Sequence, residues 1–497
     1  MESLFLELQI DRQFKRKAAL LMHLNDMPDN TSSKRDILIK LHITPPTLLA
    51  DISVLNKELN DYLHIFSPRE GEYQLFLRTG TSLSTVLAQL TKQTVPFQIV
   101  NSIFHERKWT FQQALTNLNI SRATLTRIIR HMNAVLKRFH VSISSRILRF
   151  SGKEEDIRCC LFAFFVNFNS NTIISENVLK DAGKWFDSIQ KSNLAYLRYN
   201  HYRITLWIAI AQIRWKCKQF VTLNDEIKKI IIRNDEFDYF TRSLRFLFEN
   251  FSLTSAPLDD EVLWAYITSL HAVSYSTSDS AGENYQHHLF HRYDIPEVFE
   301  EIQQFIYRMM PHIRPGDDAY IKIESFLVNT RILSRLSPIY EMTQPTIIQN
   351  MKNNHPDVFK KFHQQLKTFS KHGKHLKFHY LEDIAACLTI LYITAIKKAR
   401  SNRSLNILFA FQGPAGYDEY LMATSKQYFA PQINIQYLFD GEMFDQIDET
   451  VKTDLIISNY DLCPPKSMTC PHVRMTNIPT PLDWKVVQEA LNRLADE

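Results

Sequence analysis

The chain repeats part of its N-terminal region at a distance of 77 residues, and this repeat constrains the fold more than any other feature. Seven positions in the range 41–59 carry the same residue as their counterparts in 118–136. Most of them are spaced three, four or seven apart, as on one face of a helix. The chain is therefore predicted to begin with two copies of one small helical unit. The identical pairs are Leu41 and Leu118, Ile43 and Ile120, Thr47 and Thr124, Leu48 and Leu125, Ile52 and Ile129, Asn56 and Asn133, and Leu59 and Leu136.

Each copy has the pattern of a helix-turn-helix motif. Thr44 and Ser121 hold the same position in the repeat, and both are residue types that cap the N-terminus of a helix. Pro45 suits the first helical position after Thr44. Each cap follows a shorter helix, predicted over 34–41 and 110–118. A short helix, a tight turn and a longer capped helix therefore recur in both copies.

A hairpin is predicted after the long helix of each copy. Apolar and polar residues alternate there on both sides of a turn, as they do in half-buried strands. The turn is Pro68–Gly71 in the first copy and Ser144–Ser145 in the second. A hairpin in this place makes each copy a winged helix-turn-helix unit. The strand residues are Ile65, Phe66, Tyr73 and Leu75 in the first copy, and Val141, Ile143, Leu148 and Phe150 in the second.

Positive charge is concentrated on the second copy. Residues 101–150 hold nine Lys and Arg against one acid, whereas the whole chain has a net charge of only +5. Charge of one sign over about 50 residues favours a polyanionic partner such as nucleic acid. A basic surface that is merely solvated is the alternative interpretation.

The long helix of the second copy is predicted to present its arginines to double-stranded DNA. Leu125, Ile129, Met132 and Leu136 recur at the spacing of a core-facing stripe. We expect the basic residues on the opposite face to reach base edges or phosphates in the major groove, and those of the wing to contact the DNA backbone. The predicted DNA-binding residues are Arg122, Thr126, Arg127 and Arg130 on this helix, Arg146 and Arg149 on the wing, and Lys57 in the first copy.

The corresponding helix of the first copy is much less basic. It is predicted to expose Pro46, Ala50 and Ser53, with Lys57 further along, and therefore to contribute less affinity for DNA. The alternative is that both copies are plain helical packing modules. The repeat, the caps, the wings and the one-sided arginines together favour DNA binding.

The central part of the chain has the pattern of one amphipathic helix after another. Glycine, which interrupts helices, makes up only 10 of 497 residues. The Ser-rich stretch Ser274–His288 separates two halves of similar size. The apolar content of 45% excludes wholesale disorder, and the usual glycine-rich nucleotide-binding motifs are absent from the sequence. Helices are predicted over 156–168, 200–218, 235–251, 259–273, 295–310, 318–336, 357–369 and 380–399.

No metal, cofactor or membrane segment is expected. The six cysteines are too dispersed for a disulfide framework, which favours a reducing cytoplasm. The apolar stretches are shorter than the about 18 residues of a membrane-spanning helix, and acids within the first residues argue against a signal peptide. Two groups of potential metal ligands lack the spacing of a known site. They are His287, His288 and His291, and Cys463, Cys470 and His472.

The pattern changes at about residue 403, where short apolar runs begin to alternate with helices. This alternation predicts a small parallel α/β sheet. The loop Gln412–Gly416 is placed to hold an anion at a helix start, but it has no nucleophile. The predicted fold class is therefore mainly α and multidomain, with a small α/β domain at the C-terminus. Strands are predicted over 405–411, 433–439, 454–458 and 473–476, and helices over 417–428 and 482–494.

This order of parts resembles the Mga/AtxA family of virulence regulators of Gram-positive bacteria, over nearly the whole chain. The resemblance implies two winged helix-turn-helix units at 1–80 and 81–155, and two helical phosphotransferase-system regulation domains (PRDs) at 156–285 and 286–402. A domain like the phosphotransferase EIIB subunit would follow at 403–497. The resemblance further implies a homodimeric, DNA-binding transcriptional regulator that is not an enzyme and needs no cofactor.

The resemblance also implies that histidines of the PRDs receive phosphate from HPr, which would couple sugar supply to gene expression. By position, His201 and His271 match the histidine places of the first PRD. His379 is the best candidate in the second PRD, where His372 and His375 compete with it. The alternative is structural, because a lone histidine beside an apolar face is more often part of the packing.

The sequence departs from the family pattern at two places, and two other functions stand as alternatives to DNA binding. The predicted helix 318–336 of the second PRD has no histidine to phosphorylate. The loop Phe411-Gln412-Gly413 has no cysteine where EIIB subunits carry phosphate, which favours dimerisation over a role as phosphocarrier. An RNA-binding antiterminator is the other alternative, since PRDs also occur there. Winged helices argue against it, because readers of RNA sequence usually stack bases on aromatic side chains of a sheet.

Overall fold

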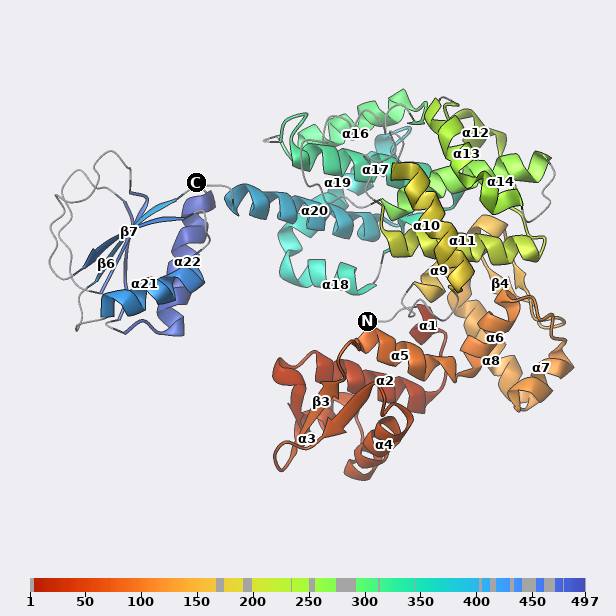
Figure 1. Cartoon of the computed structure of the whole chain (residues 1–497), viewed down its shortest axis with the longest axis horizontal. Helices are drawn as coiled ribbons and strands as arrows, with labels where there is room; N and C mark the ends of the chain where they lie inside the picture. The colour runs from red at the N-terminus through yellow and green to blue at the C-terminus, as the bar shows by residue number, and fades with distance from the viewer. Residues whose placement is uncertain are drawn as a thin grey trace. The chain divides into compact units, whose positions relative to one another are not determined.

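The computed structural model describes two compact units, Met1–Thr389 and Ile390–Glu497. Helix α20 (Leu381–Ser401) carries the chain from the first unit into the second. The chain is mainly helical with small sheets, as the sequence predicts (Figure 1). The described residues are 4–166, 174–190, 199–233, 235–249, 255–273, 292–311, 313–343, 345–401, 405–411, 417–429, 433–439, 453–459, 470–476 and 478–496.

The first copy of the repeat is a winged helix-turn-helix, as predicted. Helices α3 (Lys34–Leu41) and α4 (Pro45–Glu58) are bent 97° from each other. His42 makes the turn between them in the left-handed conformation, with φ of 51°. The antiparallel wing has the strand order β1-β3-β2. The other elements are α2 (Arg12–Asn25), β1 (Thr31–Ser33), β2 (Leu63–Phe66) and β3 (Glu72–Leu77).

The second copy repeats the helix-turn-helix with a smaller, two-stranded wing. Asn119, which is the repeat counterpart of His42, turns the chain with φ of 49°. Thr110 forms a bridge with Ile147, in the place where Ser33 of β1 pairs with Glu72 in the first copy. The elements are α5 (Leu83–Lys92), α6 (Val95–Phe104), α7 (Phe111–Leu118), α8 (Arg122–Leu136), the 3-10 turn η2 (Lys137–Phe139), β4 (Ser142–Ile143) and β5 (Phe150–Ser151).

The remainder of the first unit is built from helices, as the periodicity predicts. Two predicted starts are wrong: α9 begins at Glu154, not at 156, and α14 begins at Ser255, not at 259. In α9, three consecutive acids form the first turn, where they favour a helix N-terminus. The predicted linker Ser274–His288 and the histidines His287, His288 and His291 lie outside the described residues. The elements are α9 (Glu154–Phe165), α10 (Glu176–Gln190), α11 (His201–Lys216), α12 (Asp225–Lys229), α13 (Asp235–Glu249), α14 (Ser255–Thr268), η5 (Ser269–Ala272), α16 (Pro296–Met309), α17 (Asp318–Leu336), η6 (Pro338–Glu341), α18 (Pro345–Asn354) and α19 (Pro356–His372).

A fully buried arginine holds α9 against α14. Arg158 donates two hydrogen bonds to Glu261, at 2.7 and 2.8 Å, and a third to Glu154 at 2.9 Å. Arg214 of α11 binds the same Glu154. Burial alone would raise the pKa of Glu154, but its bonds to Arg214 and Arg158 outweigh burial, and the pKa falls below its ordinary value. The two arginines and the two glutamates of this cluster are therefore all paired with a charge of opposite sign.

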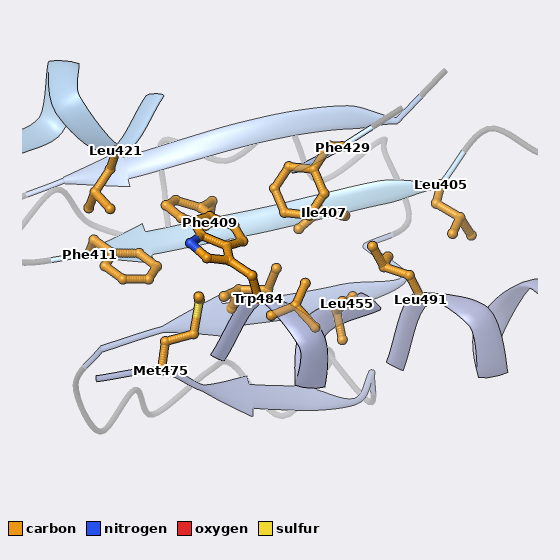
Figure 2. Packing of buried hydrophobic residues seen from close by; sticks show 12 residues of the cluster. Leu405, Ile407, Phe409, Phe411, Leu421, Phe429, Leu455, Met475, Trp484 and Leu491 are labelled. Carbon is orange, nitrogen blue, oxygen red and sulfur yellow. The ribbon is translucent and has the colours of Figure 1, made fainter. Parts of the chain in front are cut away.

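The second unit is the predicted parallel α/β sheet. Its strands β6 (Asn406–Phe411), β7 (Asn434–Phe439), β8 (Leu455–Ser458) and β9 (His472–Arg474) lie in the order β7-β6-β8-β9, all parallel. Helices α21 (Tyr417–Tyr428) and α22 (Pro481–Asp496) accompany it. Figure 2 shows Trp484 of α22 directed toward Phe409 of β6 within the apolar cluster, and the two rings stack. The loop Gln412–Gly416 and Cys463 lie outside the described residues.

Three observations concern membranes, disulfides and metals within the described ranges. No single helix there is long and apolar enough to cross a membrane, although the bent pair α3 and α4 passes a test of joint length and composition. The described cysteines are all free thiols. Those ranges contain no group of three or more metal-ligating side chains.

Candidate nucleic-acid interface and histidine sites

Helix α8 separates its two faces as the sequence predicts. Ser121 caps the helix by accepting a hydrogen bond from the backbone N–H of Thr124 at 3.2 Å. The predicted core stripe is buried, with Ile128 added to it. The polar face is exposed and carries Arg122, Thr126, Arg127 and Arg130.

The wing brings further basic residues beside α8. Arg146 and Arg149 are both exposed. Two backbone bonds tie the wing to the start of α7: Leu148 donates to Trp109 at 2.8 Å, and Phe111 donates to Arg146 at 3.3 Å. Because the wing is fastened in this way, its basic residues keep their place relative to α7 and α8.

A surface hollow lies between α8, the start of α7 and the wing. It brings together three of the predicted residues, Arg122, Thr126 and Arg146. The guanidinium of Arg122 lies over the ring of Phe111, 5.2 Å from its centroid, and both residues line the hollow. No acid is among the residues that line the hollow, so its field is positive. The lining residues are Thr110, Phe111, Gln112, Arg122, Thr126, Ile129, Ser145 and Arg146.

An asparagine clamps the wing to α8, a role that helix periodicity does not predict. Asn133 donates from Nδ2 to the carbonyl of Ile143 at 3.0 Å and accepts from its N–H at 2.6 Å. Asn56 makes the same two bonds to Ile65 in the first copy, both at 2.7 Å. The identity of Asn56 and Asn133 is the sequence signal for this clamp, but the spacing of the repeat alone places both residues only on a helix face.

The first copy presents a different surface on α4. Pro46, Ala50, Ser53 and Lys57 are exposed, as predicted. Lys57 lies in this copy and does not line the hollow beside α8. Thr44 occupies the N-cap position, but its side chain makes no cap hydrogen bond and contacts the hydroxyl of Thr47 at 2.9 Å instead.

Among the candidate histidines, His379 combines an exposed side chain with a buried carboxylate next to its Nδ1. Its Nδ1 lies 3.3 Å from Oε1 of Glu341, whose side chain is fully buried, whereas the His379 side chain is 59% exposed. Oε2 of Glu341 accepts the backbone N–H groups of His379 and Tyr380, at 2.6 and 2.9 Å. A carboxylate only accepts, so this pattern assigns a proton to Nδ1, and in the neutral ring the lone pair then lies on Nε2.

His271 differs from His379 because its Nδ1 accepts a hydrogen bond instead of donating one. The indole N–H of Trp207 donates to its Nδ1 at 3.2 Å, and Arg203 donates to its carbonyl at 2.8 Å. Burial, with a smaller effect of the Arg203 charge, lowers the pKa of His271 well below its ordinary value. An indole N–H only donates, so the pattern assigns the proton of the neutral ring to Nε2. Neither nitrogen then offers a free lone pair.

The other three histidines differ in their surroundings. His201 is exposed at the start of α11 and stacks on Phe186, with ring centroids 3.7 Å apart. His372 is exposed and bonds through Nδ1 to the carbonyl of Thr368 at 3.0 Å. His375 is part-buried, and its backbone N–H binds Glu301.

A chain of contacts joins the His379 segment to the second winged unit. The hydroxyl of Tyr380 donates to the carbonyl of Arg138, in η2 directly after α8, at 3.2 Å. The guanidinium of Arg138 in turn pairs with Glu7 at 2.7 Å. His131 of α8 contacts the carbonyl of the same Glu7 at 2.8 Å. The residue after His379 therefore touches the segment that ends α8.

Comparison with known proteins confirms the resemblance drawn from the sequence. Residues 79–165, which contain the second winged unit, match the family described as the Mga helix-turn-helix domain. The chain is similar to the capsule synthesis positive regulator AcpB of Bacillus anthracis, with 20% identity over 458 residues, which is 90% of this chain and 92% of that protein. It is also similar to the capsule synthesis positive regulator AcpA of the same organism, with 24% identity over 117 residues, or 24% of each chain. The resemblance to the Mga/AtxA regulators thus extends over most of the chain.

Proposed function

We propose that this chain, which resembles the Mga/AtxA regulators, is a transcriptional regulator that binds double-stranded DNA mainly through its second winged unit. The observation that carries the proposal is the exposed row of arginines on α8 beside a basic wing, within the region that matches a helix-turn-helix domain. The two relatives are positive regulators of capsule synthesis by their names. We propose regulation, not catalysis, for this chain as well.

The geometry of α8 suits the major groove of DNA. Arg122, Arg127 and Arg130 project from one face, where guanidinium groups can bind guanine edges or phosphates. Arg146 and Arg149 are placed on the wing for contact with the sugar-phosphate backbone, which fixes the register of a protein on DNA without specifying sequence. Thr126 and Lys57 complete the proposed set, with Lys57 as a peripheral contact.

We further propose that HPr phosphorylates PRD histidines and that the C-terminal EIIB-like domain serves homodimerisation in the cytoplasm. Of the candidates His201, His271 and His379, the last is supported best, because it combines exposure with a carboxylate on Nδ1. A phosphoryl group adds about two negative charges. Placed beside Tyr380, these charges would bias the contact with Arg138 at the end of α8. The proposed domain limits are those given by the sequence.

The test of DNA binding is a mobility-shift titration of the full chain against a promoter-length duplex at several salt concentrations. We expect Arg122/Arg127/Arg130→Ala to lower affinity about 100-fold or more, since each arginine contact is worth about 1–3 kcal/mol. The slope of log affinity against log salt should flatten by about 2 to 3, at about 0.9 per lost phosphate contact.

The matched control removes three positive charges elsewhere. Lys360, Lys367 and Lys371 are exposed on α19, and their replacement by Ala changes the net charge equally. We expect this control to keep at least half of the wild-type affinity. Equal losses in both variants would indicate a general charge effect, and unchanged affinity of the arginine variant would remove α8 from the mechanism. A competing RNA hairpin that displaces the duplex would favour the antiterminator function.

A further inference from the structure

The segment 373–380 between α19 and α20 carries two of the competing histidines and is held by two carboxylates. Glu301 accepts backbone N–H groups of Lys374, His375 and Leu376 at 2.6–3.1 Å. Glu341 holds the end of the segment through the backbone N–H groups of His379 and Tyr380. Only Glu341 also reaches a histidine ring among these contacts.

We infer that Glu341 is a positioning residue that makes Nε2 of His379 the phosphate-accepting nucleophile of this region. The inference rests on the proposed function and adds to it the residue that selects the histidine. The Nδ1 proton is held toward the carboxylate, so the Nε2 lone pair points away from Glu341 on the 59% exposed ring. A carboxylate next to one ring nitrogen of a histidine fixes the tautomer and the orientation of the ring.

The phosphoryl-transfer step needs this arrangement. The Nε2 lone pair of His379 attacks phosphorus in a donor of the phosphoramidate class, an Nε2–P bond forms, and the P–N bond of the donor breaks with its electron pair leaving on the donor nitrogen. The ring keeps its Nδ1 proton and becomes a cation. The buried carboxylate of Glu341 faces that cation at Nδ1, so it stabilises the charge that develops during attack.

The neighbouring histidines show why a carboxylate matters. His271 carries its proton on Nε2 and has Nδ1 engaged by Trp207, so attack from either nitrogen requires that contact to break. His372 has the same tautomer as His379, but its Nδ1 bonds to the neutral carbonyl of Thr368. Charge-assisted hydrogen bonds are roughly twice as strong as neutral ones. His379 is therefore the better nucleophile, and His372 is an internal control in the same molecule.

The experiment treats the full chain with potassium phosphoramidate and measures phosphate on His379 and His372 by mass spectrometry. In Glu341→Gln, which removes the charge, we expect the rate at His379 to fall about tenfold while the rate at His372 stays within twofold. An equal change at both sites, or no change at His379, would overturn the inference.

A second measurement covers the case in which Glu341→Gln disturbs folding. Long-range ¹H–¹⁵N spectra of wild-type protein with labelled histidine report the tautomer directly, with His379→Gln used to assign its signal. In the neutral ring we expect a protonated Nδ1 and a bare Nε2, and a neutral ring with its proton on Nε2 would overturn the inference without any variant at Glu341. Phosphoramidate needs neither HPr nor DNA. If HPr does not phosphorylate His379, the proposed regulation is refuted, whereas the role of Glu341 is decided by these two readouts alone.

Discussion

The two winged units share a scaffold and differ in the surface that the scaffold presents. Both turn the chain on a left-handed residue, His42 or Asn119, and both fasten the wing to the long helix through an asparagine. The leading helix of each is capped by a hydroxyl, from Ser33 or Thr110. The two copies therefore share the features that the fold requires, with identical residues at the asparagine and with different residue types at the turn and the cap.

The differences fall where the long helices face outward or meet other elements. Shifting by 77 residues places Pro45, Ala50 and Ser53 opposite Arg122, Arg127 and Arg130. Buried Asp51 of α4, which pairs with Arg16 of α2 at 2.8 Å, has the apolar Ile128 as its counterpart. The comparison teaches that the same scaffold can carry a basic outer surface in one copy and a nearly uncharged one in the other, and the following predictions test whether this difference sets the affinity for DNA.

The largest effect is expected from the asparagine clamps. Asn133→Ala and Asn56→Ala each leave a backbone N–H and carbonyl of a wing residue without their side-chain partner, at a cost of about 1–3 kcal/mol. Hydrogen exchange at Ile143 and Ile65, followed by mass spectrometry, should show that loss of local stability in both copies. DNA affinity should fall only for Asn133→Ala.

The control for this comparison is Asn117→Ala, an exposed change on α7 that should alter protection by less than about 0.5 kcal/mol. If Asn56→Ala weakens DNA binding as much as Asn133→Ala does, both wings contact DNA, and the division of roles between the copies is wrong.

The sequence predicted local structure well because the signals are local. Caps, helix periodicity and strand alternation placed both winged units and the parallel sheet. Contacts between distant residues carried no such signal: Glu341 and His379 are 38 positions apart, and Tyr380 and Arg138 are 242 apart. The repeat pointed to Asn133, but its periodicity alone could not separate a clamp from a packing residue.

A smaller effect, of opposite sign, is expected when the surface of the second copy is moved to the first. Ala50→Arg with Ser53→Arg places two guanidinium groups on the exposed face of α4. We expect affinity for duplex DNA to rise up to about tenfold and the salt slope to steepen by about 1 to 2. The charge-matched control puts arginine at exposed Gln364 and exposed Thr368 of α19, and it should leave the salt slope unchanged. A gain in the control equal to that in α4 would mean that added charge, not the helix face, sets affinity.

The smallest effect is expected for Lys57→Ala, the one basic residue that the first copy contributes to the proposed interface. Lys57 is exposed on the last turn of α4, so its removal should not disturb packing. A single peripheral phosphate contact predicts a loss of affinity of about threefold or less, and a slope change of at most about 0.9.

The same titration in Arg122/Arg127/Arg130→Ala sharpens the comparison. If the second copy makes the main contact, Lys57→Ala should add little in that background, whereas a loss of tenfold or more would show that the first copy binds DNA on its own once the arginines of α8 are gone.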